Sequence, residues 1–172
     1  MSRTNVVLIG MPGAGKSTLG VVLAKVMGKD FIDGDLLIQT RFGKTLAQLI
    51  EERGINGFLE LENQALGSID VENAVISTGG SAVYSPQAME RLQAKGVTVY
   101  LRVGLDELSS RLGDLTQRGV VMREGITDDL AALHAEREPL YLRYADVVFD
   151  SVGPSIRALA EDLAQLLALQ QS

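Results

Sequence analysis

The sequence predicts one α/β domain, with five parallel strands in a single sheet and helices on both of its faces. Runs of β-branched and apolar residues alternate with segments of helical periodicity along nearly the whole chain, which is typical of a three-layer α/β/α arrangement. A chain of 172 residues is long enough for one such domain and too short for two. Right-handed crossovers place the loops that follow the strands along one edge of the sheet, so we expect a functional cleft there.

The first predicted strand, residues 5–9, leads into a glycine-rich loop and then into a helix over residues 19–27. Residues 10–18 read Gly-Met-Pro-Gly-Ala-Gly-Lys-Ser-Thr, which fills every fixed position of the phosphate-binding pattern G-x-x-x-x-G-K-[ST]. Strand, loop and helix follow in the order that this pattern requires. The sequence therefore predicts a nucleoside triphosphate site and a P-loop fold, rather than a plain glycine-rich turn before an ordinary helix.

The residue types in this loop suit phosphate binding. Gly13 and Gly15 carry no side chains, so successive backbone N–H groups can surround a phosphate at the N-terminus of the helix. Lys16 can contact the outer phosphates, and the Ser17 hydroxyl can bind the magnesium ion that bridges them. We expect the nucleotide to contact Gly13, Ala14, Gly15, Lys16, Ser17 and Thr18.

The second predicted strand is short, at residues 31–32, and runs into Asp33-Gly34-Asp35. In an extended chain Asp33 and Asp35 point the same way, so one carboxylate could hold magnesium and the other could accept a proton from a substrate hydroxyl. The alternative is a pair of helix-capping aspartates, because residues 36–39 look like a helix start. The phosphate loop nearby favours the functional interpretation.

A helical insertion follows over about 36–70, with helices expected at residues 45–52 and 57–66. It would lie over the sheet edge beside the aspartates, where a kinase places its second substrate. The third strand, residues 73–78, opens into Gly79 and Gly80. These glycines indicate either close approach of the backbone to a ligand or a simple tight turn.

The second half of the chain supplies the remaining elements. Residues 113–127 have no sustained period and suit a mobile lid, in which Arg118 could bring a cation to the transferring phosphoryl group. The helix expected over 128–144 should break near Pro139. The other predicted helices are 86–95, 105–112 and 155–169, and the other strands are 96–103 and 147–149.

Composition narrows the range of functions. The formal charge of −6 argues against broad attraction to nucleic acid. Cysteine is absent and His134 is the single histidine, so any metal should be held by oxygen. No apolar run is long enough to cross a bilayer, and no signal-peptide pattern is present, so we expect a cytoplasmic protein. We also expect a monomer. The arginines that could capture an anionic ligand gather late in the chain: Arg111, Arg118, Arg123, Arg137 and Arg143.

Taken together, these residues resemble the shikimate kinase family, which consists of small P-loop kinases with a fold like that of the nucleoside monophosphate kinases. The resemblance spans nearly the whole chain, and its most selective part is the Asp-x-Asp pair combined with residues 137–141, Arg-Glu-Pro-Leu-Tyr. It implies ATP-dependent phosphorylation of a hydroxyl on shikimate or a similar small acid, in aromatic amino acid biosynthesis. The other matching positions are the phosphate loop, Phe58, Glu62, Gly79, Gly80 and Arg118.

Individual roles carry over from the resemblance to the matching positions. On the nucleotide side it implies that Ser17 and Asp33 support magnesium, that Lys16 contacts the phosphates, and that Arg118 closes over ATP. On the acceptor side, the resemblance implies that Asp35 binds the substrate diol and acts as the base, and that Arg137 binds the substrate carboxylate. It also implies that the Gly79-Gly80 stretch offers a backbone contact through Gly80.

The chain departs from the family pattern at three positions. Leu59 stands where the family has an arginine that helps to clamp the substrate carboxylate, Ser81 replaces a third glycine, and Gly119 replaces the proline after Arg118. Losing a bidentate guanidinium contact costs about 1.5 to 3 kcal/mol of binding free energy. The acceptor is therefore either shikimate, bound weakly through Arg137 alone, or a related hydroxylated molecule with less negative charge near Leu59.

Two other functions stay open from the sequence. One is a P-loop kinase with another acceptor, such as a gluconate-type sugar acid or another polyol; a nucleoside monophosphate is disfavoured because the insertion holds only Arg41 and Arg53. The other is a non-catalytic nucleotide-binding protein. The presence of Lys16, Ser17 and the two aspartates argues against that alternative.

Overall fold

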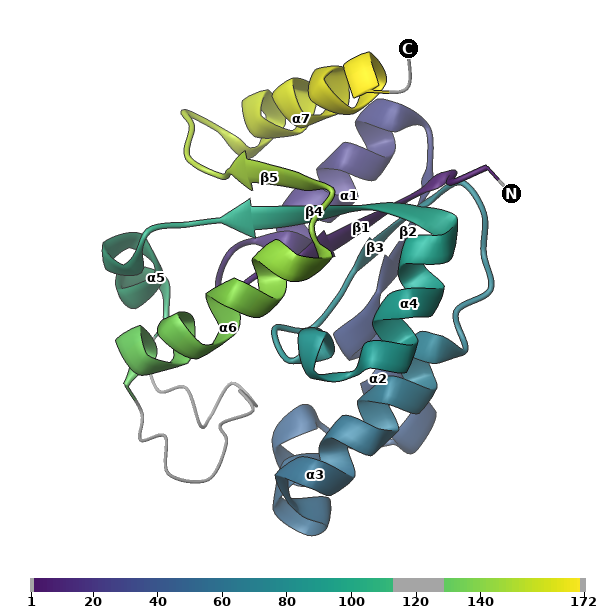
Figure 1. Ribbon diagram of the computed structural model, residues 1–172, viewed down its shortest axis with the longest axis vertical. Coiled ribbons are helices and arrows are strands. Elements are labelled where there is room, and N and C mark those ends of the chain that lie inside the picture. Colours follow the sequence, from purple (N-terminus) through teal and green to yellow (C-terminus); the bar gives the residue numbers. More distant parts are fainter. Residues whose placement is uncertain (1, 113–128, 171–172) are drawn as a thin grey trace.

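The protein forms a five-stranded parallel sheet flanked by helices, as a computed structural model that describes residues 2–112 and 129–170 shows (Figure 1). The strands lie in the order β2-β3-β1-β4-β5, and every neighbouring pair is parallel. The predicted sheet is therefore confirmed. Its strands are β1 (Asn5–Ile9), β2 (Asp30–Asp33), β3 (Ala74–Ser77), β4 (Gly96–Arg102) and β5 (Val147–Asp150).

Helices cover both faces of this sheet, with α1 and α7 on one face and α4 and α6 on the other (Figure 1). The C-terminal helix α7 packs on α1, which begins at the end of the phosphate loop. The helices are α1 (Lys16–Met27), α2 (Gly34–Phe42), α3 (Leu46–Gly67), α4 (Pro86–Lys95), α5 (Leu105–Arg111), α6 (Leu130–Tyr144) and α7 (Ile156–Gln170), and a 3₁₀ turn, η1, covers Ala82–Tyr84.

The main core is built around β1, whose five residues are all buried. This strand lies between β3 and β4, and a parallel strand covered by helices on both faces is apolar on both sides, which explains the aliphatic run over residues 6–9. The buried Asn5 side chain is hydrogen-bonded to the backbone of Val71 and Ala74. The carboxyl ends of β1, β2 and β3 consequently reach one edge of the sheet together. The loops that leave these ends carry the phosphate pattern, the two aspartates and the paired glycines.

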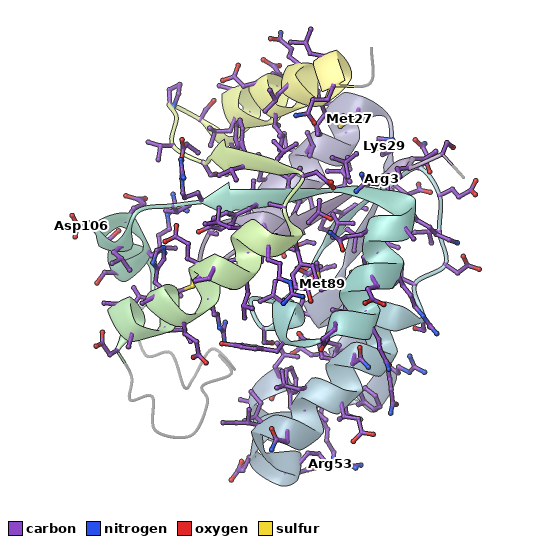
Figure 2. All side chains as sticks on the ribbon, viewed as in Figure 1. Arg3, Met27, Lys29, Arg53, Met89 and Asp106 are labelled. Atoms are coloured by element: carbon purple, nitrogen blue, oxygen red, sulfur yellow. The ribbon has the colours of Figure 1, made fainter. Side chains whose placement is uncertain are left out.

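The insertion formed by α2 and α3 has a small core of its own. Ile38, Leu49, Phe58 and Ala65 form a second buried cluster, separate from the main one. The two predicted helices of the insertion form one element, α3, that is kinked at Gly54. The kink lies next to Arg53, at the end of the insertion that points away from the sheet (Figure 2). There the backbone has φ 69° and ψ 176°, a conformation that glycine adopts readily and other residues avoid.

Two expectations about local structure are wrong. Helix α6 continues through Pro139, because Leu133 and Tyr141, both fully buried, anchor it on either side of the proline. Asp33 and Asp35 are not on an extended chain either, since β2 ends at Asp33 and α2 begins at Gly34. Within the described residues, no helix is both long and apolar enough to cross a membrane.

Candidate active site

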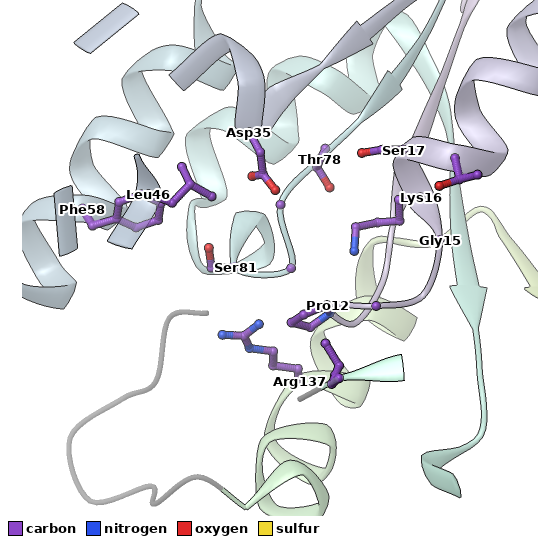
Figure 3. A pocket seen from close by; sticks show the side chains of 15 residues that line it. Pro12, Gly15, Lys16, Ser17, Asp35, Leu46, Phe58, Thr78, Ser81 and Arg137 are labelled. Carbon is purple, nitrogen blue, oxygen red and sulfur yellow. The ribbon is translucent and has the colours of Figure 1, made fainter. Parts of the chain in front are cut away.

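A cavity of about 390 Å³ lies at the carboxyl edge of the sheet (Figure 3). The phosphate loop forms one side, Asp35 and the insertion form another, and residues 78–81 and Arg137 complete the wall. The structure thus brings together segments from the first, second and last thirds of the chain. Arg118 and the expected lid, residues 113–127, lie outside the described residues.

The phosphate loop has the backbone geometry that its glycines predict. Gly13 and Gly15 have φ values of 78° and 87°, in the left-handed region where a side chain would introduce strain. The Lys16 ammonium donates hydrogen bonds to the carbonyl oxygens of Gly10 and Met11, both at 2.8 Å. Burial lowers the pKa of Lys16 to about 8, although the neighbouring Asp35 carboxylate acts in the opposite direction.

Ser17 and Asp33 are in direct contact beside this loop. The Ser17 hydroxyl donates to Asp33 Oδ2 at 2.7 Å, and Ser17 Oγ lies 3.2 Å from Ser77 Oγ. Asp33 Oδ1 also accepts a hydrogen bond from the backbone N–H of Leu36, so this aspartate caps α2 as well. The capping interpretation is therefore confirmed for Asp33, and its magnesium role stays a prediction. Ser77 is a neighbour that sequence reasoning missed.

Asp35 lies in the first turn of α2 and lines the cavity together with Lys16 (Figure 3). Burial raises its pKa; the Lys16 ammonium opposes this shift, and the Asp33 carboxylate adds to it. Gly79 packs against this carboxylate: a Cβ at Gly79 would lie 2.6 Å from Asp35 Oδ1 and 2.9 Å from Glu62 Oε2. A side chain at Gly79 would displace both carboxylates, which explains the glycine.

Gly80 occupies an equally narrow space. A Cβ there would lie 2.9 Å from Pro12 Cδ of the phosphate loop and 3.0 Å from Arg137 Nη1. The Gly80 carbonyl accepts a hydrogen bond of 2.7 Å from the Tyr141 hydroxyl of α6. The paired glycines thus lie close to charged side chains of the cavity wall and to the phosphate loop, and their close approach to a ligand stays a prediction.

Arg137 projects from α6 and is only 1% exposed, yet it lines the cavity. Its guanidinium lies over the Tyr84 ring, with Cζ 5.3 Å from the ring centroid, and its Nε donates to the Tyr84 hydroxyl at 3.4 Å. Tyr84 belongs to η1, and the sequence analysis did not single it out. The sequence feature that could have pointed to Tyr84 is its position as an aromatic residue shortly after the paired glycines.

Glu62 lies behind the glycine stretch and is fully buried. Its Oε1 accepts a hydrogen bond of 2.8 Å from the Ser81 hydroxyl. Burial raises the pKa of Glu62 to about 7, and the Ser81 hydrogen bond opposes that shift. Both residues were noted in the sequence only through the resemblance, Glu62 as a match and Ser81 as a departure.

Leu59 packs against the second buried cluster, next to Phe58. It lines a separate groove with Tyr84, whereas Phe58 and Leu46 line the main cavity. At this position the chain therefore presents an aliphatic side chain outside the main cavity wall.

Comparison with known proteins agrees with this architecture. The family model for shikimate kinase matches residues 12–168. A shikimate kinase of Francisella tularensis subsp. novicida is 34% identical over 170 residues, covering 97% of each chain, and one of Legionella pneumophila is 33% identical over 164 residues, covering 95% of this chain and 94% of its own.

Solved structures give the same result. The shikimate kinase of Acinetobacter baumannii in complex with shikimate superposes with a TM-score of 0.87 at 30% identity, covering 97% of this chain and 94% of that one. The Bacteroides thetaiotaomicron shikimate kinase gives a TM-score of 0.81 at 35% identity, covering 96% and 98%. The chain therefore belongs to the shikimate kinase family of ATP-dependent small-molecule kinases.

Proposed function

We propose that this protein transfers the γ-phosphoryl group of ATP to a hydroxyl of shikimate. The observation that carries the proposal is the single cavity lined by the phosphate loop, Asp35 and Arg137. These residues offer a phosphate cradle, a carboxylate for the attacking hydroxyl, and a guanidinium for an acid group. The relative from Acinetobacter baumannii, which binds shikimate, has the same fold.

On the nucleotide side, the backbone of residues 13–18 and the Lys16 ammonium would hold the phosphates. Ser17 and Asp33, a hydroxyl and a carboxylate in contact at 2.7 Å, are oxygen donors of the kind that Mg²⁺ prefers. The described residues contain no cluster of three or more carboxylate or histidine side chains that could hold a metal, so phosphate oxygens and water would complete the coordination. When bound, magnesium would neutralise phosphate charge; Arg118 is proposed to add a further cation.

On the acceptor side, Asp35 would accept the proton of the attacking hydroxyl, and Arg137 would bind the carboxylate of the acceptor. The raised pKa of Asp35 suits a base that must both take up and release a proton. The backbone of Gly79 and Gly80, which has no side chains in the way, would lie against the acceptor. Because transfer of a phosphoryl group depends mostly on position and charge, these contacts can supply most of the catalysis.

Phosphorylation of shikimate would place the protein in aromatic amino acid biosynthesis. We propose further that it acts in the cytoplasm and as a monomer. A related sugar acid or polyol remains the second candidate acceptor, because Leu59 offers no charge to a second carboxylate contact.

The test is ADP release with and without shikimate, followed by the Asp35→Asn variant. We expect Asp35→Asn to lower kcat at least 100-fold while ATP affinity stays within about twofold, since the amide cannot accept the proton. Wild-type protein that is inactive with shikimate but active with a sugar acid would assign the second acceptor class. Equal turnover in the variant would remove Asp35 from the mechanism.

A further inference from the structure

Ser81 is a polar residue in the cavity wall that has no role yet in the proposed binding of ATP or of the acceptor. It is 5% exposed and lines the main cavity, and Figure 3 shows it on the same side as Asp35 and Arg137. A serine hydroxyl has one proton to donate and two lone pairs with which to accept. The Ser81 proton points to Glu62 Oε1 at 2.8 Å. The hydroxyl can therefore offer the cavity only its lone pairs.

Glu62 fixes this direction as the acceptor of the Ser81 proton. It is fully buried on α3, and its Oε2 has no hydrogen-bond partner among the described residues. The charged groups that act on it come from three other elements: Asp35 from α2, Lys16 from α1 and Arg137 from α6. As long as Glu62 is ionised, it can only accept, so the Ser81 proton stays on the Glu62 side.

We propose that Ser81 recognises a hydroxyl of the acceptor by accepting its proton in a hydrogen bond, and that Glu62 positions Ser81 for this contact. The inference rests on the proposed function, because it assigns a further contact to the same acceptor. A hydroxyl whose lone pairs face the cavity attracts an O–H donor and repels a carboxylate. The acid group of the acceptor is then directed to Arg137, and a ring hydroxyl to Ser81.

This arrangement also gives the pocket a specificity that a glycine at position 81 could not provide. Removing one partner of a hydrogen bond in a buried site leaves the other without a partner, and such losses discriminate strongly between ligands. The contact therefore favours polyhydroxylated acids over acids that lack the matching hydroxyl. When Glu62 becomes protonated it can itself donate to Ser81, which frees the serine proton to turn toward the cavity and weakens the discrimination.

The test pairs a protein variant with a ligand variant. KM and calorimetric Kd are measured for shikimate and for analogues that each lack one of the ring hydroxyls that is not phosphorylated. For wild-type protein we expect one analogue to bind about three- to tenfold more weakly than shikimate, which is the effect of one hydrogen bond. Ser81→Ala should bind shikimate as weakly as wild-type protein binds that analogue, and should not discriminate between the two. KM for ATP should not change.

Two controls separate recognition from general disturbance. Ser85→Ala removes a buried hydroxyl from the same loop that has no hydrogen-bond partner in the described structure and does not line the main cavity, so it should behave as wild type. The wild-type ratio between analogue and shikimate should be larger at pH 8 than at pH 6, and Glu62→Gln should remove this pH dependence. The pH profile needs no variant at Ser81, so it tests the inference even if that variant fails to fold.

The outcomes separate this inference from the proposed function. Wild-type protein that phosphorylates shikimate, with Ser81→Ala keeping the wild-type ratio for every analogue, overturns the role of Ser81 alone. A ratio that is flat between pH 6 and 8 overturns the positioning role of Glu62. Wild-type protein that neither phosphorylates nor binds shikimate overturns the proposed function, and the inference with it.

Discussion

At the level of single residues, Lys16 in the cavity wall and Glu62 behind it are buried ionisable groups whose pKa values are shifted toward neutrality from opposite directions. Burial lowers the pKa of Lys16 to about 8 and raises that of Glu62 to about 7. Both shifts have burial as their main cause, because burial disfavours the charged form of each group. An anion at the phosphate loop would favour the charged form of Lys16.

Nucleotide binding should consequently be linked to proton uptake by Lys16. At pH 8 this lysine is about half protonated, and the phosphates of ATP should raise its pKa, so about half a proton should be taken up per ATP bound. Calorimetry in buffers of different ionisation enthalpy measures this number. At pH 6.5 Lys16 is already protonated, so its part of the uptake should vanish and only Glu62, with its pKa of about 7, can contribute. Adenosine, which has no phosphates, should cause no uptake at pH 8. Equal uptake with adenosine would show that another group takes up the proton.

Ionisation of the buried Glu62 should lower the free energy of unfolding as the pH rises. Its pKa is about 7 in the folded protein and 4.5 in the reference state, so between these values the folded state binds more protons than the unfolded state. The free energy of unfolding should therefore fall from pH 5 to pH 8, by up to about 3 kcal/mol from this residue. Asp35, whose pKa is also raised, contributes with the same sign.

Glu62→Gln tests this prediction directly. The variant should be about 1 to 3 kcal/mol more stable than wild type at pH 8 and similar to it at pH 5, as measured by urea unfolding at both pH values. Asp70→Asn, which alters a fully exposed carboxyl, is the control and should leave the pH dependence unchanged. A wild-type stability that rises from pH 5 to pH 8 would contradict the assignment.

The sequence predicted most of these residues from local patterns, but not how they share their contacts. Residues 10–18 could be recognised because every fixed position of a phosphate loop lies within nine consecutive residues. The contact between Ser81 and Glu62 joins residues 19 positions apart on different elements, and no local pattern encodes it. The sequence also left the capping role of Asp33 open, because a cap and a site residue have the same sequence signal.

At the level of elements, α6 links the acceptor wall to the phosphate loop. Its Tyr141 hydroxyl donates to the Gly80 carbonyl at 2.7 Å and lies 3.9 Å from Met11 Sδ, while its ring stacks on Tyr100 with centroids 5.1 Å apart. Arg137 lies one helical turn earlier on the same helix. A break at Pro139 would have separated these two contacts, so the continuity of the helix is what places both at the cavity.

Tyr141→Phe should weaken this link. The variant keeps the ring and removes the donor, which leaves the half-buried Gly80 carbonyl without that hydrogen bond, so the free energy of unfolding should fall by about 1 kcal/mol. Urea unfolding measures the change, and Tyr144→Phe, a half-buried tyrosine on the same helix, should change stability by less than about 0.5 kcal/mol. Equal losses in both variants would show that the Gly80 contact contributes nothing specific.

Elements were predicted well where periodicity and composition agree, and less well where tertiary contacts decide. The strands and most helices follow their apolar patterns. Two features do not follow from these patterns. Helix α6 continues through Pro139 because its packing on the main core outweighs the helix-breaking tendency of proline, and α3 is kinked because of the backbone conformation of Gly54 alone. Local preferences alone could not distinguish a broken helix from a kinked or continuous one.

At the level of the whole molecule, the protein consists of a sheet core and a smaller α2–α3 unit that meet at the cavity. The second cluster, centred on Phe58, is distinct from the main core, although Leu66 near the end of α3 belongs to the main one. The insertion is thus anchored at one end and held elsewhere by a small core. Small clusters of this kind open locally at a lower free energy than a central sheet does.

Hydrogen exchange should reveal this division. Amides of α2 and of the first part of α3 should exchange faster than those of β1, because opening the second cluster leaves the sheet intact. Shikimate should slow exchange in α2–α3, since Asp35, Leu46 and Phe58 line the cavity, whereas a non-hydrolysable ATP analogue should mainly protect residues 10–18.

Phe58→Ala should accelerate exchange in α2–α3 by removing the largest side chain of the second cluster, with little change in β1. Equal acceleration in β1 would mean that the insertion and the sheet open as one unit, so that an acceptor could not close the insertion independently of the nucleotide.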